Sequence, residues 1–314
     1  MPKEIIINGS SIRKGESKHV NLNTYSLPTR TVIEIPVYVF RSVKKGPVVL
    51  LLAGMHGDEI NGIEIIRRLI VKNHLNNLRC GTVIAIPVIN IISFIYGSRE
   101  LPDGRDLNRC FPGSLSGSLG SRIAHDLMRE IIPQIDIGID FHTGGASRSN
   151  YPQIRCLFNN EKNLNLAKQF GASFILNSPF RENSLRKEAA KIGKTILVFE
   201  GGESSRFDSS AINEGMEGCM RLLQNLKMLD VSITEKQSKI INKATWVRAI
   251  NSGLFHAYKK NGSFTRKNEV IGAISDPYGE FEIKLKSPSN GYIIGLNNLP
   301  LVNRGDALIH IGIE

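Results

Sequence analysis

Short apolar segments bounded by turn residues recur through the first three quarters of the chain. Such segments are typical of strands that are buried on both faces of a parallel sheet. The strands predicted in this way are residues 48–53, 81–88, 136–141 and 195–199. Between the first two, apolar residues recur every three to four positions from Ile60 to Ile70, which indicates a helix that begins near Glu59. A strand, a helix and a strand in this order predict a βαβ unit with a parallel strand pair.

The same alternation continues as far as residue 231. Helices are expected at 119–132, 161–170 and 211–228, and short strands at 154–158 and 173–176. Residues 1–46 alternate β-like segments with polar turns, and 31–40 contains a proline, which suits an edge strand. The predicted fold class is therefore α/β, a mixed and mostly parallel sheet flanked by helices, with an N-terminal β lead-in packed on it.

The pattern changes after a polar linker at 232–243. Residues 244–314 are rich in short strands and glycines and show no helical periodicity. Two similar halves, around Gly253 and Gly291, predict a small all-β domain that resembles the barrel-sandwich fold of biotinyl and lipoyl domains. Those domains carry a cofactor on a lysine at a hairpin tip, and the corresponding residues 288–291 (PSNG) hold no lysine, so a swinging-arm role is not expected.

The net charge and its distribution limit the classes of binding partner that we expect. The 314 residues carry a net charge of +11, from 40 Lys and Arg against 29 Asp and Glu. The basic residues are scattered, without long blocks or aromatic interleaving, and no nucleic-acid motif is present. We therefore expect no nucleic-acid partner, and the excess charge suits attraction of small anionic substrates.

Other features place the chain among cytoplasmic proteins. The four cysteines have no metal-ligand spacing and indicate free thiols in a reducing compartment. The N-terminus lacks the apolar core of a signal peptide. The longest apolar stretch, 84–96, is interrupted and too short to span a bilayer, so no membrane association is expected.

Polar residues with metal-binding chemistry follow two of the predicted strands. His56 and Glu59 stand just past the strand at 48–53, and His142 follows the strand at 136–141. The carboxyl ends of parallel strands meet at one edge of a sheet, where ligands bind in α/β folds. Two histidines and a glutamate with an open fourth position are a known catalytic zinc arrangement. The sequence thus predicts a metal site at this edge.

A carboxylate is expected at the same edge. Glu200 directly follows the strand at 195–199 and precedes two glycines, which is where a general base for a zinc-bound water should stand. Glu203, past the glycines, is the reserve candidate. His125, on a largely polar helix face, is expected to be a surface or partly buried residue and not a ligand.

Residues 90–113 form a long segment with few structural signals, and such loops are often functional. The segment carries Arg99, Arg105 and Arg109, with Asn108 beside the last. Guanidinium groups bind carboxylates through two parallel hydrogen bonds, so the segment is a candidate carboxylate clamp. An exposed basic loop without a binding role is the alternative.

Four short motifs, taken in order, resemble the succinylglutamate desuccinylase/aspartoacylase family, a branch of the zinc carboxypeptidase-like enzymes. They are GMHGDE (54–59), RDLNRCFPG (105–113), DFHTGG (140–145) and VFEGG (198–202). Each is weak alone, and their order makes the resemblance specific. It covers about residues 45–230 and implies that 47–231 is a zinc hydrolase catalytic domain. The tail, 244–314, resembles the C-terminal domain of many bacterial members.

The resemblance implies a role for each residue of the metal centre. His56, Glu59 and His142 would bind one zinc ion per chain, and Glu200 would serve as the general base. Asp106 would orient a ligand histidine, which metal sites commonly require.

The resemblance also implies roles for the residues of the candidate carboxylate clamp. Asn108 and Arg109 would hold the α-carboxylate of the substrate, with Arg105 as a further substrate-binding candidate. Arg99 would polarise the scissile carbonyl. The expected reaction is hydrolysis of the amide bond of a small anionic N-acyl amino acid or a close relative.

Two alternatives remain. A metallocarboxypeptidase that acts on short peptides would use the same residues, and only substrate assays separate it from a deacylase. A non-catalytic zinc- or ligand-binding protein would not need Glu200. The sequence does not indicate the acyl group, the amino-acid side chain, or whether the chain forms a homo-oligomer.

Overall fold

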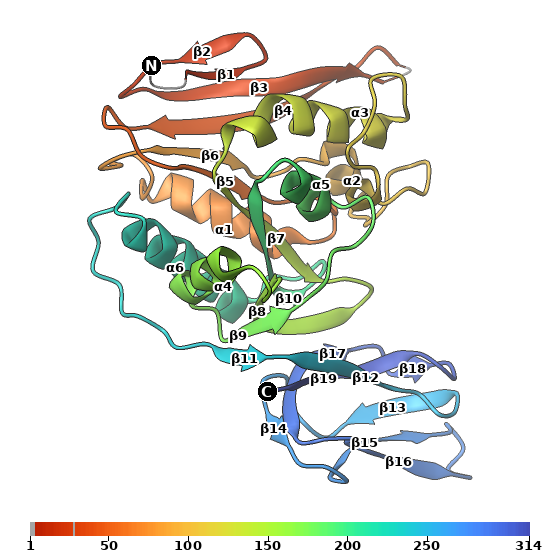
Figure 1. Ribbon diagram of the computed structural model, residues 1–314. Coiled ribbons are helices and arrows are strands. Elements are labelled where there is room, and N and C mark those ends of the chain that lie inside the picture. Colours follow the sequence, from red (N-terminus) through yellow and green to blue (C-terminus); the bar gives the residue numbers. More distant parts are fainter. Residues whose placement is uncertain (1–3, 28) are drawn as a thin grey trace.

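One long sheet runs through the molecule, and its parallel strands carry the candidate site (Figure 1). The structure is a computed structural model that describes residues 4–27 and 29–314. The parallel strands are β5 (Val48–Leu52), β6 (Thr82–Ile86), β7 (Ile137–Gly144) and β10 (Thr195–Glu203). They lie in the order β10-β7-β5-β6, so the predicted mixed and mostly parallel α/β sheet is confirmed.

Helices cover both faces of this sheet. Those of one face are α1 (Ile60–Val71), α4 (Glu161–Phe170) and α6 (Ser209–Asn225), and those of the other are α3 (Leu119–Asp126) and α5 (Leu185–Lys191). Alternate residues of one strand enter different cores: Leu51 packs with α1, whereas Leu50 packs with α3 and α5. No helix in the described part of the chain combines the length and apolarity needed to cross a bilayer.

The segment 90–113, expected to have little structure, holds two short helices. The α2 helix (Ile91–Tyr96) is capped by Asn90, whose side chain accepts a hydrogen bond from the Ser93 backbone N–H. A single 3₁₀ turn, η1 (Leu107–Arg109), is capped by Asp106. These caps fix the course of the segment that carries Arg99 and Arg109.

The helix predicted at 119–132 is regular only as far as Asp126. It continues as a π turn, η2 (Leu127–Ile131), and a 3₁₀ turn, η3 (Ile132–Gln134). Pro133 lies in the last turn, so it ends the helical path, as its missing N–H requires.

Two N-terminal strands, β3 (Ser17–Ser26) and β4 (Val32–Arg41), extend the sheet beyond β6. The first two strands, β1 (Ile5–Ile7) and β2 (Ser10–Ile12), form a separate two-stranded antiparallel sheet. The expectation that 31–40 is an edge strand is wrong, because β4 pairs with β6 on one side and with β3 on the other. Pro36 is tolerated because the pairing with β6 begins only at Tyr38.

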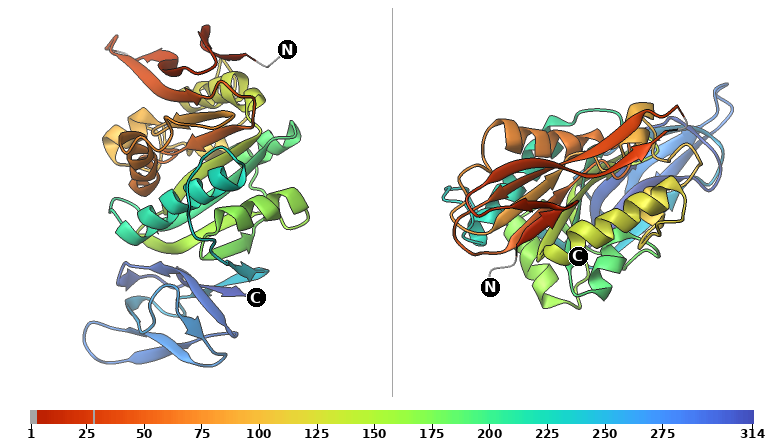
Figure 2. Two further views of the ribbon diagram at one scale, coloured as in Figure 1. Left: turned by 90° about the vertical axis from the view of Figure 1, so that its left-hand side faces the viewer. Right: turned by 90° about the horizontal axis from the view of Figure 1, so that it is seen from above.

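The C-terminal strands join the other end of the sheet through β8 (Arg148–Cys156), which is antiparallel to both β10 and β17. Strands that continue the main sheet are β9 (Phe174–Asn177), β11 (Lys239–Ile241), β12 (Lys243–Arg248), β14 (Phe264–Thr265), β17 (Gly291–Asn297) and β19 (Ala307–Ile313). A separate antiparallel sheet is formed by β13 (Gly253–Ala257), β15 (Val270–Ser275), β16 (Glu282–Lys286) and β18 (Leu301–Val302). A core that includes Phe255 and Ile309 links the two sheets. The predicted small C-terminal β unit is thus present, and it is continuous with the main sheet through the pairing of β17 with β8. Figure 2 shows the C-terminal strands at the opposite end of the molecule from the N-terminal strands.

Gly57 provides a test of the packing beneath the candidate site. A Cβ at this position would overlap the backbone of Ser93 in α2, which cannot move without disturbing the helix. We expect Gly57→Ala to lower the free energy of unfolding by about 3 kcal/mol, in the upper part of the range for overpacked sites. Denaturant titration measures the change. Gly145→Ala is the matched control, because its Cβ meets no backbone: it lies 3.1 Å from the tip of the flexible Arg99 side chain and at an ordinary contact distance, 3.6 Å, from Glu59 Oε1. Equal stability of both variants would contradict the close packing at Gly57.

Candidate active site

The candidate site lies where β5, β7 and β10 end. In the strand register His142 of β7 stands opposite Glu200 of β10, and Asp140 stands opposite Val198. Residues two apart on a strand point to the same face, so Asp140, His142 and Glu200 share the face that α3 and α5 cover. His56 lies in the turn after β5, and Glu59 is the N-cap residue of α1. Segments far apart in the sequence therefore converge at one sheet edge, as predicted.

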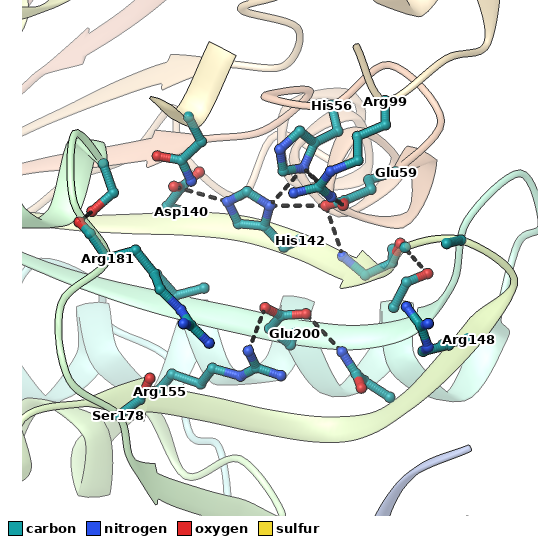
Figure 3. A pocket seen from close by; sticks show the side chains of 18 of the residues that line it. His56, Glu59, Arg99, Asp140, His142, Arg148, Arg155, Ser178, Arg181 and Glu200 are labelled. Atoms are coloured by element: carbon teal, nitrogen blue, oxygen red, sulfur yellow. Dashed lines mark hydrogen bonds and ion pairs between the residues drawn. The ribbon is translucent and has the colours of Figure 1, made fainter. Parts of the chain in front are cut away.

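His56, Glu59 and His142 form a buried cluster of potential metal ligands. Glu59 lies between the rings, with Oε1 2.8 Å from Nδ1 of His56 and Oε2 2.8 Å from Nδ1 of His142. The two Nδ1 atoms are 3.3 Å apart. All three residues are at most 5% exposed. Figure 3 shows the three side chains turned toward one another.

The far nitrogen of each imidazole contacts a carboxylate. Nε2 of His56 lies 3.0 Å from Asp106 Oδ1, and Nε2 of His142 lies 3.0 Å from Asp140 Oδ2. An ionised carboxylate can only accept, so a neutral ring that keeps its single proton on Nε2, toward Asp106 or Asp140, offers its Nδ1 lone pair to the cluster. Two lone pairs then face each other beside a carboxylate. These donors fit a metal ion well, since carboxylates that hold ligand histidines from behind are common in metal sites.

The buried carboxylates make this cluster favourable for positive charge. Burial lowers the pKa of His142, but Asp140 and Glu59 outweigh it and hold that pKa well above its ordinary value. Burial also lowers the pKa of His56, and Glu59 and Asp106 again prevail and raise it. Burial raises the pKa of Glu59, whereas the two histidines lower it well below its ordinary value. Protonation of the histidines or binding of a cation would each supply the positive charge that these carboxylates favour.

Arg99 reaches the same cluster from the segment between α2 and η1. Its Nη1 lies 3.1 Å from Glu59 Oε1, and its Nη2 lies 2.9 Å from Asp106 Oδ2. Asp106 thereby holds both His56 and Arg99. The Arg99 side chain is 37% exposed, so it lies at the boundary between the buried cluster and solvent. A carbonyl placed against the cluster from the cavity would be within its reach.

Glu200 lies beside the cluster and is held by two donors. Asn150 Nδ2 donates to Oε2 at 2.7 Å, and Arg155 Nη1 lies 3.2 Å from Oε1. Glu200 lines the cavity in front of the cluster (Figure 3). Glu203, the reserve candidate, does not line it; its backbone carbonyl accepts from Asn61.

The carboxylate clamp is only partly assembled at the cavity. Asn108 and Arg109 line it, and Asn108 Oδ1 accepts a hydrogen bond from the Leu185 backbone N–H at 3.0 Å, which docks this turn against α5. Arg105 does not line the cavity. It is 60% exposed and lies 3.7 Å from Asp103. The structure therefore brings Arg99 and Arg109 to the site. Arg105 lies in solvent, as the alternative of an exposed basic loop would have it.

His125 lies apart from the cluster. Its Nδ1 contacts Asp126 at 3.3 Å in α3, and its side chain is 25% exposed. This agrees with the expectation of a surface or partly buried histidine.

The cavity has a volume of about 420 Å³, and several residues that line it were not predicted. They are Arg148 and Arg155 on β8, Arg181 and Arg186 at α5, and Trp246 on β12. Trp246 stacks on His310 with ring centroids 4.4 Å apart, and the Arg148 guanidinium lies 5.8 Å from the indole centroid. Arg148 and Arg155 reach the cavity through the antiparallel pairing of β8 with β10 and β17, and Arg181 and Arg186 reach it from α5 and the segment before it. No local pattern in the sequence marked these positions. The lone tryptophan of the chain was the one available signal.

Comparison with known proteins gives a consistent result for the core of the chain. Residues 45–226 match the family described as the succinylglutamate desuccinylase/aspartoacylase catalytic domain. A curated relative, the N-alpha-acetyl-L-2,4-diaminobutyric acid deacetylase of Halomonas elongata, is 30% identical over 186 residues, which are 58% of this chain and 49% of that protein. The chain thus spans about half the length of this relative.

Solved structures resemble nearly the whole fold. The product-bound ectoine utilization protein EutE of Ruegeria pomeroyi has a TM-score of 0.85 at 22% identity, covering 95% of both chains. A succinylglutamate desuccinylase/aspartoacylase from Rhodobacter sphaeroides has a TM-score of 0.84 at 25% identity, also covering 95% of both chains. The likeness includes the C-terminal strands, which lie outside the residues matched by the family.

Asp140 provides a test of the metal centre. Replacing it with asparagine removes the negative charge behind His142, which fixes the ring and strengthens its Nδ1 as a donor. We expect Asp140→Asn to weaken metal binding by about 10- to 100-fold, as for other such partners of ligand histidines. Competition with a chromophoric chelator measures the affinity. Asp136→Asn is the control, because Asp136 accepts from the Val48 backbone N–H at the opposite end of the strands. Unchanged affinity in Asp140→Asn would contradict a metal at Nδ1 of His142.

Proposed function

The chain belongs to the succinylglutamate desuccinylase/aspartoacylase family, and on that premise we propose that it is a zinc-dependent hydrolase of N-acyl amino acids or related small amides. The observation that carries the proposal is the buried His56–Glu59–His142 cluster, which opens on a cavity lined by Glu200. A metal site beside a carboxylate on the same strand edge provides the parts that amide hydrolysis by water requires.

A zinc ion held by His56, Glu59 and His142 would supply Lewis acidity, which favours deprotonation of water near neutral pH and accumulation of charge on a carbonyl oxygen. Glu200 takes a proton from the attacking water and delivers it to the leaving amine nitrogen. The products are the acyl carboxylate and the free amino acid, so the water is consumed and the C–N bond is broken.

The chain's other cavity residues position the substrate. Arg99 stands where it can donate to the carbonyl oxygen as negative charge develops there, an interaction worth about 3 kcal/mol in comparable sites. Asn108 and Arg109 are proposed to hold the α-carboxylate, because a guanidinium and an amide side chain together match its two oxygens. The docking of Asn108 on α5 keeps this turn in place.

The size of the cavity supports a small substrate over a peptide. A volume of about 420 Å³ is within the range of small-molecule sites and suits an N-acyl amino acid. The Halomonas elongata relative is named for removal of an acetyl group from an amino acid, which is the same reaction class. We therefore favour deacylation over carboxypeptidase activity, and we favour either hydrolytic activity over a non-catalytic binding role.

Replacement of Glu200 tests the assigned base. Glu200→Gln keeps the shape and the contact with Asn150 but cannot accept a proton. We expect kcat to fall by about 10²- to 10⁴-fold while the metal content is unchanged. Glu203→Gln is the matched control and should retain activity, since Glu203 does not line the cavity. Full turnover by Glu200→Gln would remove Glu200 as the base.

Metal analysis tests the centre itself. Protein purified without added metal should contain about one divalent ion per chain, and a strong chelator should abolish hydrolysis until zinc is restored. The assay uses a panel of N-acetyl, N-succinyl and N-aspartyl amino acids together with short peptides. Metal-free protein that still turns over these substrates would contradict the mechanism, and preference for the peptides would favour the carboxypeptidase alternative.

A further inference from the structure

A second cavity lies at the amino ends of the parallel strands, at the edge of the sheet opposite the candidate active site. Its volume is about 200 Å³, and its lining includes Val48 and Thr82, which begin β5 and β6, and Asp136, which precedes β7. His56 follows the other end of β5. Since a strand of five residues spans roughly 15 Å, this cavity and the metal centre are separate sites.

Four basic side chains from three segments line this cavity. Arg41 ends β4, Lys44 and Lys45 lie between β4 and β5, and Lys14 lies between β2 and β3. The three lysines form no ion pair with the described residues. Asp136 is the acidic residue of the described lining, and its Oδ2 already accepts a hydrogen bond from a backbone N–H at 2.9 Å. The cavity therefore carries a surplus of positive charge.

Two buried hydroxyl groups lie among these charges. Thr82 is 4% exposed and Ser42 is 8% exposed, and both line the cavity. Ser42 Oγ accepts from the Lys44 backbone N–H at 3.3 Å, which leaves its own hydrogen available for donation. The Thr82 hydroxyl has no hydrogen-bond partner in the described part of the chain. A buried hydroxyl without a partner carries a desolvation penalty, which an acceptor in the cavity would relieve.

The pairing of the strands holds these groups in place without a ligand. Arg41 of β4 stands opposite Thr82 of β6. The Gly81 backbone N–H donates to the Lys44 carbonyl at 3.0 Å, which ties the turn before β5 to the start of β6. The two segments approach so closely that a Cβ at Gly46 would lie 2.6 Å from the Gly81 nitrogen. Because the backbone is already ordered, a ligand would bind here with little loss of conformational entropy.

We propose that this cavity binds a phosphate group, either as inorganic phosphate or as the end of a small phosphate ester. Several cations and two hydroxyl donors match a tetrahedral dianion, whose oxygens accept hydrogen bonds in several directions. A single carboxylate offsets less of the charge and offers two oxygens. A volume of about 200 Å³ lies below the range of sites for drug-sized molecules, which favours a small anion over a nucleotide. The proposal does not depend on the proposed function.

Calorimetric titration of the full chain with inorganic phosphate tests the proposal. The chain is loaded with zinc, freed of unbound zinc and kept at constant ionic strength. We expect saturable binding that Lys45→Met weakens by about 3- to 10-fold, because an exposed charge is partly screened by solvent. Thr82→Val keeps the shape and removes the hydroxyl, and it should weaken binding by about fivefold, as for one neutral hydrogen bond.

Two further variants locate the binding. Lys284→Met changes the net charge equally at an exposed position on β16 and should leave the affinity unchanged. Arg109→Met removes a cation from the candidate active site, whose arginines also attract phosphate. Phosphate binding that is weakened by Arg109→Met and retained in Lys45→Met would belong to the active site and would overturn the proposal. Absence of saturable binding, or an equal loss of affinity in Lys284→Met, would overturn it as well.

Other anions test the chemistry of the ligand. Sulfate is also a tetrahedral dianion and should bind, whereas acetate should bind at least tenfold more weakly than phosphate. Acetate binding as tight as that of phosphate would mean unspecific attraction and would overturn the proposal. Glycerol 3-phosphate separates the two sources of the phosphate group: tighter binding than inorganic phosphate identifies an ester as the ligand, and weaker binding identifies the free ion.

Discussion

The carboxylate of Glu59, placed between two imidazole rings, is the interaction on which the site depends. Its oxygens contact Nδ1 of His56 and of His142, and all three groups are removed from water. A buried carboxylate in such a place is stable only beside positive charge. Asp106 and Asp140 add to this demand from behind the rings and at the same time fix their orientation. The centre is thus built to hold a cation before any substrate arrives, and the strand ends that carry these residues must keep their register for it to form.

The C-terminal strands contribute to that register. β8 lies between β10 and β17, and Asn150 pairs with Gly295 of β17 while its side chain donates to Glu200. Gln153 reaches the Ile294 carbonyl at 3.0 Å, and the Ser147 carbonyl accepts from the Asn298 N–H. Trp246 enters the cavity directly from β12. The small β unit therefore supports the partner of the proposed base and contributes Trp246 to the lining of the cavity, although the family motifs end before it begins.

The residues that sequence reasoning placed well are those next to parallel strand ends. His56, His142 and Glu200 each follow an apolar segment, and the topology of a parallel sheet brings such ends together without further information. The direction of the Arg105 side chain, which lies outside the cavity lining, could not be predicted, because a basic loop has no periodicity that indicates which way its side chains point. Arg155 was missed because it lies on an antiparallel strand whose partner depends on pairing between distant segments. The pairing of β3 with the outer side of β4 could not be predicted for the same reason. The order of strands in a sheet depends on contacts between distant segments, which the composition of a single strand does not encode.

The distribution of charge connects the metal centre to substrate selection. Glu59, Asp106 and Asp140 together offset a divalent cation and Arg99, so the metal half of the site is close to neutral when loaded. Arg155 and Glu200 neutralise each other. The surplus positive charge therefore lies in the substrate half, on arginines without acidic partners, and of these Arg186 is buried, where screening by water and salt is weakest.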